Sequence, residues 1–254
     1  KEFSNQINMS GVNSINWARI IAQSVYYFYC YFLAEDDNQP INFSVPTGNF
    51  GDVYAGYLAK KLGLPINKLI VATNQNDILH RAISKGKYEA EHVSETISPS
   101  MDIQIASNFE RLIYDLNNHD SSQTLDDMKN IKQNGKYTID VEKLKKINQD
   151  FLSARISEQE TLDVIKNIYE KFNMVLDPHT AIGYGAFDKH DLKGNNIVLA
   201  TAHPCKFPDA ILKAINLKSD LPDELKFILD EKENYGIIEN NLKEIKQYIL
   251  GKIK

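Results

Sequence analysis

Two glycines three residues apart stand in Gly48-Asn49-Phe50-Gly51, between an apolar segment and an amphipathic one. The composition predicts a buried strand over Ile41–Val45 and a helix over Asp52–Leu62. Glycines at such a corner let backbone N–H groups turn toward an anion, and the helix adds its positive end. The spacing matches neither the Rossmann pattern nor the P-loop, which ends in Lys-Ser/Thr. The residues alone leave two interpretations open, a phosphate cradle or a glycine-bearing tight turn.

A second polar group precedes a long apolar run. On a helix predicted over Asn13–Glu35, with Ser10 or Asn13 as its N-cap, the side chains of Asn13, Asn16, Arg19 and Gln23 share about one third of the circumference. The run Ile20–Ala34 is shorter than the roughly 20 apolar residues of a membrane span, so we expect a buried core helix. The polar residues then form either a solvated stripe or the wall of a cavity.

Three further positions carry candidate side chains. Ser107 has Glu110 at capping-box spacing, which is typical of a helix start. Asp177-Pro-His179-Thr180 is also typical of a helix start, with proline in the first turn. Thr201 and His203 follow a predicted strand, at the end of the strand where open α/β sheets bind ligands.

Helices and strands alternate along most of the chain. Beside Ile41–Val45, strands are predicted over Lys68–Thr73 and Asn196–Thr201. Helices are expected over 52–62, 77–84, 103–116, 124–133, 141–149, 158–173 and 178–187, with two more amphipathic helices after Asp220. This order indicates an α/β fold with a parallel β-α-β core. We expect three parts: an α/β core (1–116), a peripheral helical insertion (117–150), and the remainder of the core with the C-terminal helices (151–254).

Composition limits the partners. A net charge of −5 over 254 residues argues against general nucleic-acid or membrane-surface binding. Cys30 and Cys205 lie far apart, which predicts neither a disulfide framework nor a metal site. With no signal-peptide pattern either, we expect a cytoplasmic protein. The start, without Met and leading into a long helix, reads as the middle of a longer polypeptide.

The chain resembles the threonine synthase family, pyridoxal-phosphate enzymes of the tryptophan-synthase-β-like fold (fold type II). The matching motifs occur in one order across nearly the whole chain. They are NSIN (13–16), VPTGNFGDVYAGYLAKKLGLP (45–65), ATNQND (72–77), SPSMDIQIASNFERL (98–112), DPHTAIGY (177–184) and TAHPCKFPDAI (201–211). The resemblance implies the carboxyl-terminal portion of such an enzyme, with pyridoxal 5′-phosphate as cofactor.

The resemblance also implies roles for individual residues. Gly48, Asn49, Phe50 and Gly51 match the cradle for the cofactor phosphate, and Thr201 matches the residue that faces the pyridine nitrogen. A hydroxyl there leaves that nitrogen largely unprotonated, whereas a carboxylate would protonate it. The expected substrate-binding residues are Asn13, Ser14, Asn16, Arg19, Ser107, Asn108 and Arg111, although a helix cap explains the last three equally well.

No residue of this chain is expected to be the catalytic lysine. In the family, the Schiff-base lysine precedes the NSIN helix, and Lys206 does not match its motif. The isolated chain is therefore expected to be inactive.

The implied activity is that of a carbon–oxygen lyase acting on phosphate, the last step of threonine biosynthesis. It converts O-phospho-L-homoserine and water to L-threonine and phosphate, in a monomer or a dimer. Two alternatives are a serine/threonine dehydratase-like enzyme, whose match to SPSMDIQIASNFERL is poor, and a non-catalytic phosphate-binding fragment.

Overall fold

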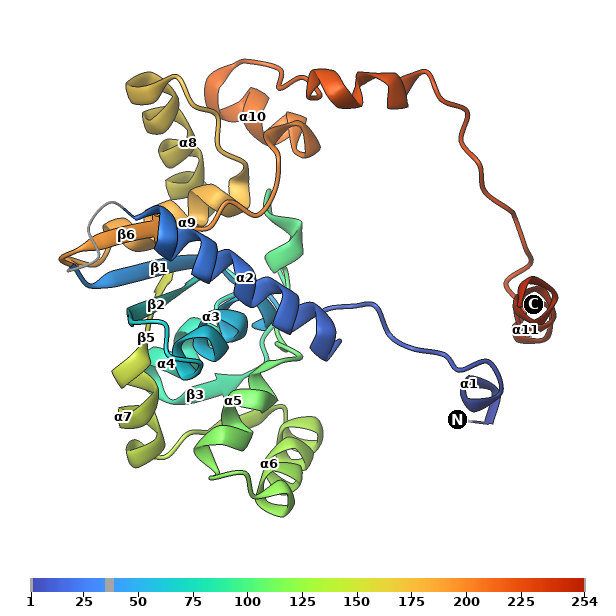
Figure 1. The fold of residues 1–254 in the computed structure, drawn as a ribbon, viewed down its shortest axis with the longest axis horizontal. Coiled ribbons are helices and arrows are strands. Elements are labelled where there is room, and N and C mark those ends of the chain that lie inside the picture. The colour runs from blue at the N-terminus through green and yellow to red at the C-terminus, as the bar shows by residue number, and fades with distance from the viewer. Residues whose placement is uncertain (1, 35–38, 254) are drawn as a thin grey trace. The chain divides into compact units, whose positions relative to one another are not determined.

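A parallel four-stranded sheet of order β5-β2-β1-β6 lies at the centre of the fold (Figure 1). The computed structural model describes residues 2–34 and 39–253. Strand β1 (Ile41–Pro46) pairs with β2 (Ile66–Thr73) on one side and β6 (Asn195–Val198) on the other, and β2 also pairs with β5 (Phe151–Arg155). The sheet confirms the α/β class and the parallel β-α-β unit.

Both faces of the sheet are buried, because helices cover each of them. Successive residues of β2 alternate between two apolar clusters: Leu69 and Val71 pack on the side of α3 (Gly51–Lys61), whereas Ile70 and Ala72 pack on the side of α9 (Pro178–Asp188). A central parallel strand buried on both faces reads as a continuous apolar run, as the LIVA segment does.

The other elements of the unit formed by residues 13–219 are two more strands, several helices and short 3-10 helices. The antiparallel pair β3 (Lys87–Glu89) and β4 (Lys136–Thr138) was not predicted, nor was α10 (Pro208–Ile215). The other elements with sequence-predicted counterparts are close to their expected ranges: α4 (Ile78–Lys85), α6 (Ser121–Asn134), α7 (Val141–Asp150) and α8 (Glu158–Phe172). Short 3-10 helices lie at η1 (Pro99–Met101) and η2 (Pro204–Lys206).

The prediction that the Ile20–Ala34 run forms a buried core helix is wrong for this chain. Helix α2 (Trp17–Leu33) buries only Ile20, Ser24 and Tyr27, which repeat at helical spacing and face the rest of the fold. Its opposite face is apolar but open, and Phe32 is 74% exposed. The N-cap is Asn16, whose Oδ1 accepts the Ala18 N–H at 2.9 Å, rather than Ser10 or Asn13. The predicted end at Glu35 lies outside the described residues.

Two other predictions need correction. The helix expected from Ile103 begins only at Phe109, as α5 (Phe109–Leu116), because the preceding residues form turns against the glycine loop. Strand β5 was missed, since Phe151–Arg155 mixes polar and apolar residues and follows α7 without a break. The three-part division at residues 116 and 150 stays a prediction.

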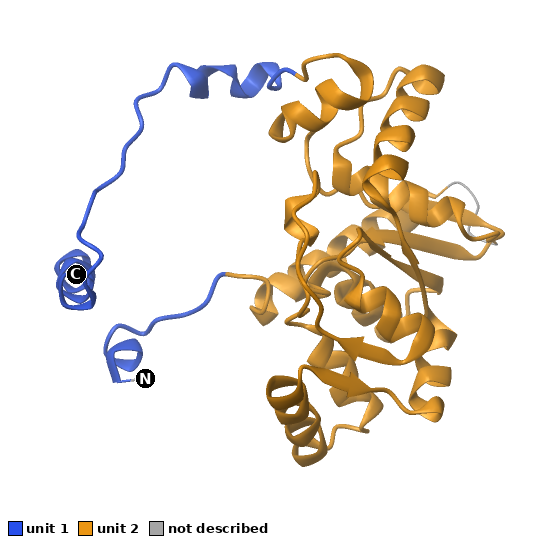
Figure 2. Ribbon diagram, turned by 180° about the vertical axis from the view of Figure 1, so that it is seen from behind, with its two compact units in different colours: residues 1–12, 220–254 blue, residues 13–219 orange. Residues whose placement is uncertain are grey.

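The chain divides into two compact units, coloured separately in Figure 2. Residues 13–219 form the unit with the sheet. Residues 1–12 and 220–254 form the other, which contains α1 (Glu2–Gln6), η3 (Asp223–Leu229) and α11 (Leu242–Lys252). The first of the two helices expected after Asp220 is thus a 3-10 helix. Within residues 2–34 and 39–253, no helix is long and apolar enough to cross a membrane.

Candidate functional site

A cleft of about 720 Å³ opens where β1 and β6 end. It brings together residues that are far apart in the sequence. Ser14, Arg19 and Gln23 come from the amino-terminal part of the unit, the glycine loop from the β1–α3 corner, and Thr201 from the segment after β6. Of the four polar residues whose role was left open, Arg19 and Gln23 line this cavity, whereas Asn13 and Asn16 are not among its lining residues.

The glycine loop packs too tightly for side chains. A Cβ on Gly48 would lie 2.6 Å from the carbonyl oxygen of Ser100, and one on Gly51 would lie 3.3 Å from Nδ2 of Asn108. Between them Phe50 has a left-handed backbone (φ 64°), which is costly for a non-glycine residue, and its side chain is buried in the core against Phe109. Phe50 can therefore serve a cradle only through its backbone.

Helix α3 begins at the last glycine of this loop. The first N–H groups of a helix have no backbone partner within it, so they add a partial positive charge beside the loop, although Asp52 Oδ1 already accepts the Val53 N–H. Gly48, Asn49 and Gly51 line the cleft. This arrangement can hold a phosphate group by backbone contacts alone.

Asn108 joins the glycine loop to the segment before α2. Its side chain is fully buried, and Nδ2 donates to the carbonyl oxygens of Ser14 (2.9 Å) and Asn49 (3.1 Å). Its Oδ1 accepts from Nε of Arg111 at 3.0 Å, and Arg111 also donates to the Ile15 carbonyl at 2.9 Å. These contacts give Asn108 and Arg111 a structural role, and their binding of substrate stays a prediction.

Ser107 does not cap α5 as the capping-box spacing predicted. The N-cap is Asn108, and its side chain makes no capping hydrogen bond. Instead Ser107 Oγ lies 3.2 Å from Asn49 Oδ1 and 3.5 Å from Ser14 Oγ. Ser107 therefore connects the glycine loop to the segment before α2. Of the other substrate-side candidates, Ser14 and Arg19 line the cleft, whereas Asn13 accepts the Ile15 N–H through Oδ1 and Asn16 caps α2.

Another part of the lining is built by the segment after β6 and the start of α9. The Thr201 backbone N–H donates to Oγ1 of Thr180 at 3.3 Å. His203, the other candidate after the strand, accepts the Cys205 N–H through Nδ1 and caps η2. His179 also lines the cleft, and its ring packs against Phe207 at 4.8 Å between centroids. The position of Thr201 is thus set by α9.

Charges of both signs face the cleft. Arg19 and Lys206 line it together with Asp52, whose Oδ1 accepts the Val53 N–H at 2.8 Å. Burial raises the pKa of Asp52 to about 6, since a carboxylate away from water is less stable than the neutral acid. A phosphate in the cradle would meet a carboxyl group that becomes neutral as the pH falls below about 6.

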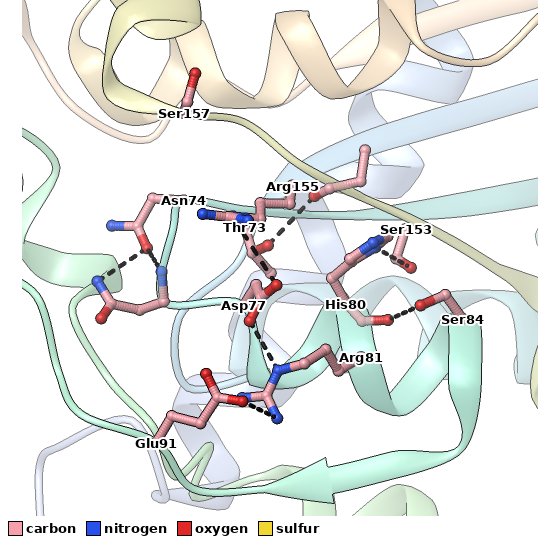
Figure 3. A network of polar contacts seen from close by, with 12 residues as sticks. Thr73, Asn74, Asp77, His80, Arg81, Ser84, Glu91, Ser153, Arg155 and Ser157 are labelled. Carbon is pink, nitrogen blue, oxygen red and sulfur yellow. Dashed lines mark hydrogen bonds and ion pairs between the residues drawn. The ribbon is translucent and has the colours of Figure 1, made fainter.

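A separate polar network ties the carboxyl ends of β2 and β5 to α4 (Figure 3). Asp77 accepts from Nε of Arg81 at 2.8 Å, and Arg81 also pairs with Glu91 at 3.1 Å. His80 Nδ1 lies 3.0 Å from the Ser153 hydroxyl, and burial lowers the pKa of that histidine. Because these side chains pair with one another, we assign the network a structural role.

The asparagines of the same ATNQND segment hold the turn that backs the glycine loop. Nδ2 of Asn74 donates to Ser98 Oγ (2.9 Å) and Asp102 Oδ1 (2.7 Å), and Nδ2 of Asn76 donates to the same carboxylate at 2.9 Å. These contacts fix residues 98–102 and hence the Ser100 carbonyl behind Gly48. In the sequence, residues 98–102 mix polar and apolar side chains without a clear period, so no pattern marks Ser100 as a site residue.

Among the described parts of the chain, no group of three or more His, Cys, Asp or Glu side chains is placed to bind a metal ion. The glycine loop and a hydroxyl residue, Thr201, line the same cleft.

Comparison with known proteins identifies related chains. Residues 180–249 match the family model described as threonine synthase, C-terminal. The chain is 44% identical to the threonine synthase of Saccharomyces cerevisiae, over 94% of this chain and 52% of that protein. It is 41% identical to the threonine synthase of Pseudomonas aeruginosa, over 94% of this chain and 51% of that protein. The chain spans about half the length of the curated relatives it matches.

A solved structure gives the same result for the fold. The crystal structure of PLP-bound threonine synthase from Brucella melitensis superposes with a TM-score of 0.95 and 43% identity, over 100% of this chain and 55% of that one. The fold is that of the threonine synthases, fold type II.

Proposed function

The chain belongs to the threonine synthase family, and we propose that it forms the part of such an enzyme that holds the phosphate of pyridoxal 5′-phosphate. The observation that carries this proposal is the placement of Gly48, Gly51 and Thr201 on one cleft. The loop offers backbone donors without side chains in the way, and Thr201 lines the same cleft. The Brucella relative, which is PLP-bound according to its description, has the same fold.

We propose further that the complete enzyme converts O-phospho-L-homoserine and water to L-threonine and phosphate. In this reaction the bond between Cγ and the phosphate oxygen breaks, and water supplies the new hydroxyl on Cβ. The bound cofactor supplies the electron sink for loss of protons from carbon. The residues of this chain bind and orient: the glycine loop holds the cofactor phosphate, and a hydroxyl at Thr201 is suited to an unprotonated pyridine nitrogen.

On the substrate side, Ser14 and Arg19 are the candidates that line the cleft. We propose that they contact the substrate, with the Arg19 guanidinium suited to an anionic group. Asn13, Asn16, Ser107, Asn108 and Arg111 remain proposed members of the same site, and their hydrogen bonds to neighbouring backbone and side chains would place the lining residues.

The test uses the full-length polypeptide, purified and supplied with pyridoxal phosphate. Incubation with O-phospho-L-homoserine should release inorganic phosphate and threonine in equal amounts, and removal of the cofactor should abolish both. Ammonia release from threonine without phosphate chemistry would instead indicate the dehydratase-like activity. Turnover by the isolated 254 residues would contradict the proposal that the catalytic lysine lies outside them.

A further inference from the structure

Asp177 is a buried carboxylate whose two oxygens serve different parts of the cleft. Its side chain has no exposed surface. Oδ1 accepts the backbone N–H of His179 at 2.9 Å and lies 3.0 Å from Nδ1 of the same residue. Oδ2 accepts the backbone N–H of Thr180 at 3.3 Å and also its hydroxyl. The two backbone contacts are ordinary capping of α9, whereas the two side-chain contacts exceed what a cap requires.

The first side-chain contact leads to the turn behind the glycine loop. Nε2 of His179 accepts the backbone N–H of Ser100 at 3.3 Å. A ring nitrogen that accepts carries no proton, so the proton is on Nδ1, which donates to Asp177. The orientation of this neutral imidazole is therefore fixed at both ends. Since the Ser100 carbonyl approaches Gly48, this contact reaches the back of the cradle.

The second side-chain contact leads to Thr201, in the segment after β6. The Thr180 hydroxyl uses its single proton toward Asp177, so its oxygen is oriented to accept. It accepts the backbone N–H of Thr201 at 3.3 Å. A chain of two hydrogen bonds thereby joins the Thr201 backbone to the carboxylate of Asp177.

The charge state of Asp177 agrees with this arrangement. Burial by itself would raise the pKa of the carboxyl group, but the hydrogen bonds from His179 and Thr180 outweigh it and lower the pKa. The carboxylate is therefore ionised at neutral pH and accepts hydrogen bonds from the side chains of both His179 and Thr180.

We propose that Asp177 is a positioning residue that sets both ends of the cofactor, through Thr180 for the pyridine end and through His179 for the phosphate end. The proposal rests on the proposed function, because it assumes that pyridoxal phosphate occupies this cleft. His179 and Thr180 are the two arms, that is, the separate hydrogen-bonded connections from Asp177 to the two ends. Each arm should therefore be removable by mutation without affecting the other.

The test uses full-length protein loaded with pyridoxal phosphate that carries ¹⁵N in its ring. Two resonances are followed, the pyridine ¹⁵N signal and the ³¹P signal of the bound phosphate. Thr180→Val keeps the shape of the side chain but removes the hydroxyl, so it should shift the ¹⁵N signal and leave the ³¹P signal in place. His179→Leu should do the opposite and raise the Kd for the cofactor about tenfold, the effect of one lost hydrogen bond. His179→Gln, whose amide oxygen can accept from Ser100, should restore much of this loss.

Asp177→Asn separates positioning from capping. Asparagine keeps only one of the two oxygens that cap α9, so a merely structural role predicts lower stability with unchanged signals. An amide, however, offers one acceptor where the carboxylate offers two, and both arms donate to it. At least one of the two resonances must then shift, beyond any fall in the melting temperature that the lost capping contact causes.

The outcomes separate the two proposals. If wild-type protein shows no bound ³¹P signal, the proposed function fails and this inference fails with it. If wild type binds the cofactor and releases phosphate from substrate, but Asp177→Asn leaves both signals unchanged, only this inference is overturned. Equal shifts of both signals in Thr180→Val and His179→Leu would also overturn it, because the arms would not be separate.

Discussion

Gly48→Ala tests the cradle with the smallest possible change. The added Cβ would lie 2.6 Å from the Ser100 carbonyl oxygen, which is 0.8 Å short of ordinary van der Waals contact at 3.4 Å. The obstacle is backbone, and its turn is held by Asn74, Asn76 and Asp102 through partly buried hydrogen bonds. The strain must therefore move the glycine loop rather than the turn.

A loop displaced by this amount misaligns the N–H groups that would hold the cofactor phosphate. Each hydrogen bond to a charged group contributes about 1.5–3 kcal/mol, so losing one weakens the Kd for pyridoxal phosphate by roughly 10- to 150-fold. Equilibrium titration of the apo full-length protein measures this directly. Gly185→Ala is the matched control, because its Cβ would meet only side-chain atoms, at 3.4 Å. A Kd for Gly48→Ala within twofold of the control would refute the cradle.

Three more perturbations address the same site. Gly51→Asp adds a carboxylate where a Cβ already lies 3.3 Å from Asn108, so the titration should show weaker cofactor binding than in Gly51→Ala. Asn108→Ala removes hydrogen bonds to two carbonyl groups and should lower the free energy of unfolding in urea by about 2–3 kcal/mol, whereas the exposed Asn134→Ala should not. Burial raises the pKa of Asp52 to about 6, so ionisation costs stability as pH rises through 6. Asp52→Asn should stabilise the apo protein by up to about 3 kcal/mol at pH 7.5, and the gain should vanish near pH 4; an equal gain at both values would contradict the burial argument.

The sequence predicted the local features of the site better than its contacts. The glycine pair at a strand-to-helix corner and Thr201 after a strand can be recognised because backbone chemistry and strand ends follow local rules. The parallel core follows from alternating apolar segments. Thus the placement of the glycine loop and of Thr201 was predictable, since both line the cleft, and their roles toward a cofactor stay predictions.

The parts that were missed depend on contacts between distant segments. Ser100 and His179 meet across 79 residues, and neither has a pattern that signals the other. Strand β5 exists because β2 offers an edge, which its own short sequence does not show. The apolar composition of α2 predicts burial but does not say on which side, and the structure buries only the stripe through Ile20, Ser24 and Tyr27.

The most direct test of the central claim follows the oxygen atoms. Full-length protein with pyridoxal phosphate is incubated with O-phospho-L-homoserine in H₂¹⁸O, and both products are examined by mass spectrometry. The account predicts one ¹⁸O atom in threonine, from the water added at Cβ, and none in phosphate, because the Cγ–O bond breaks. Label in phosphate together with unlabelled homoserine would show simple hydrolysis at phosphorus and would contradict it.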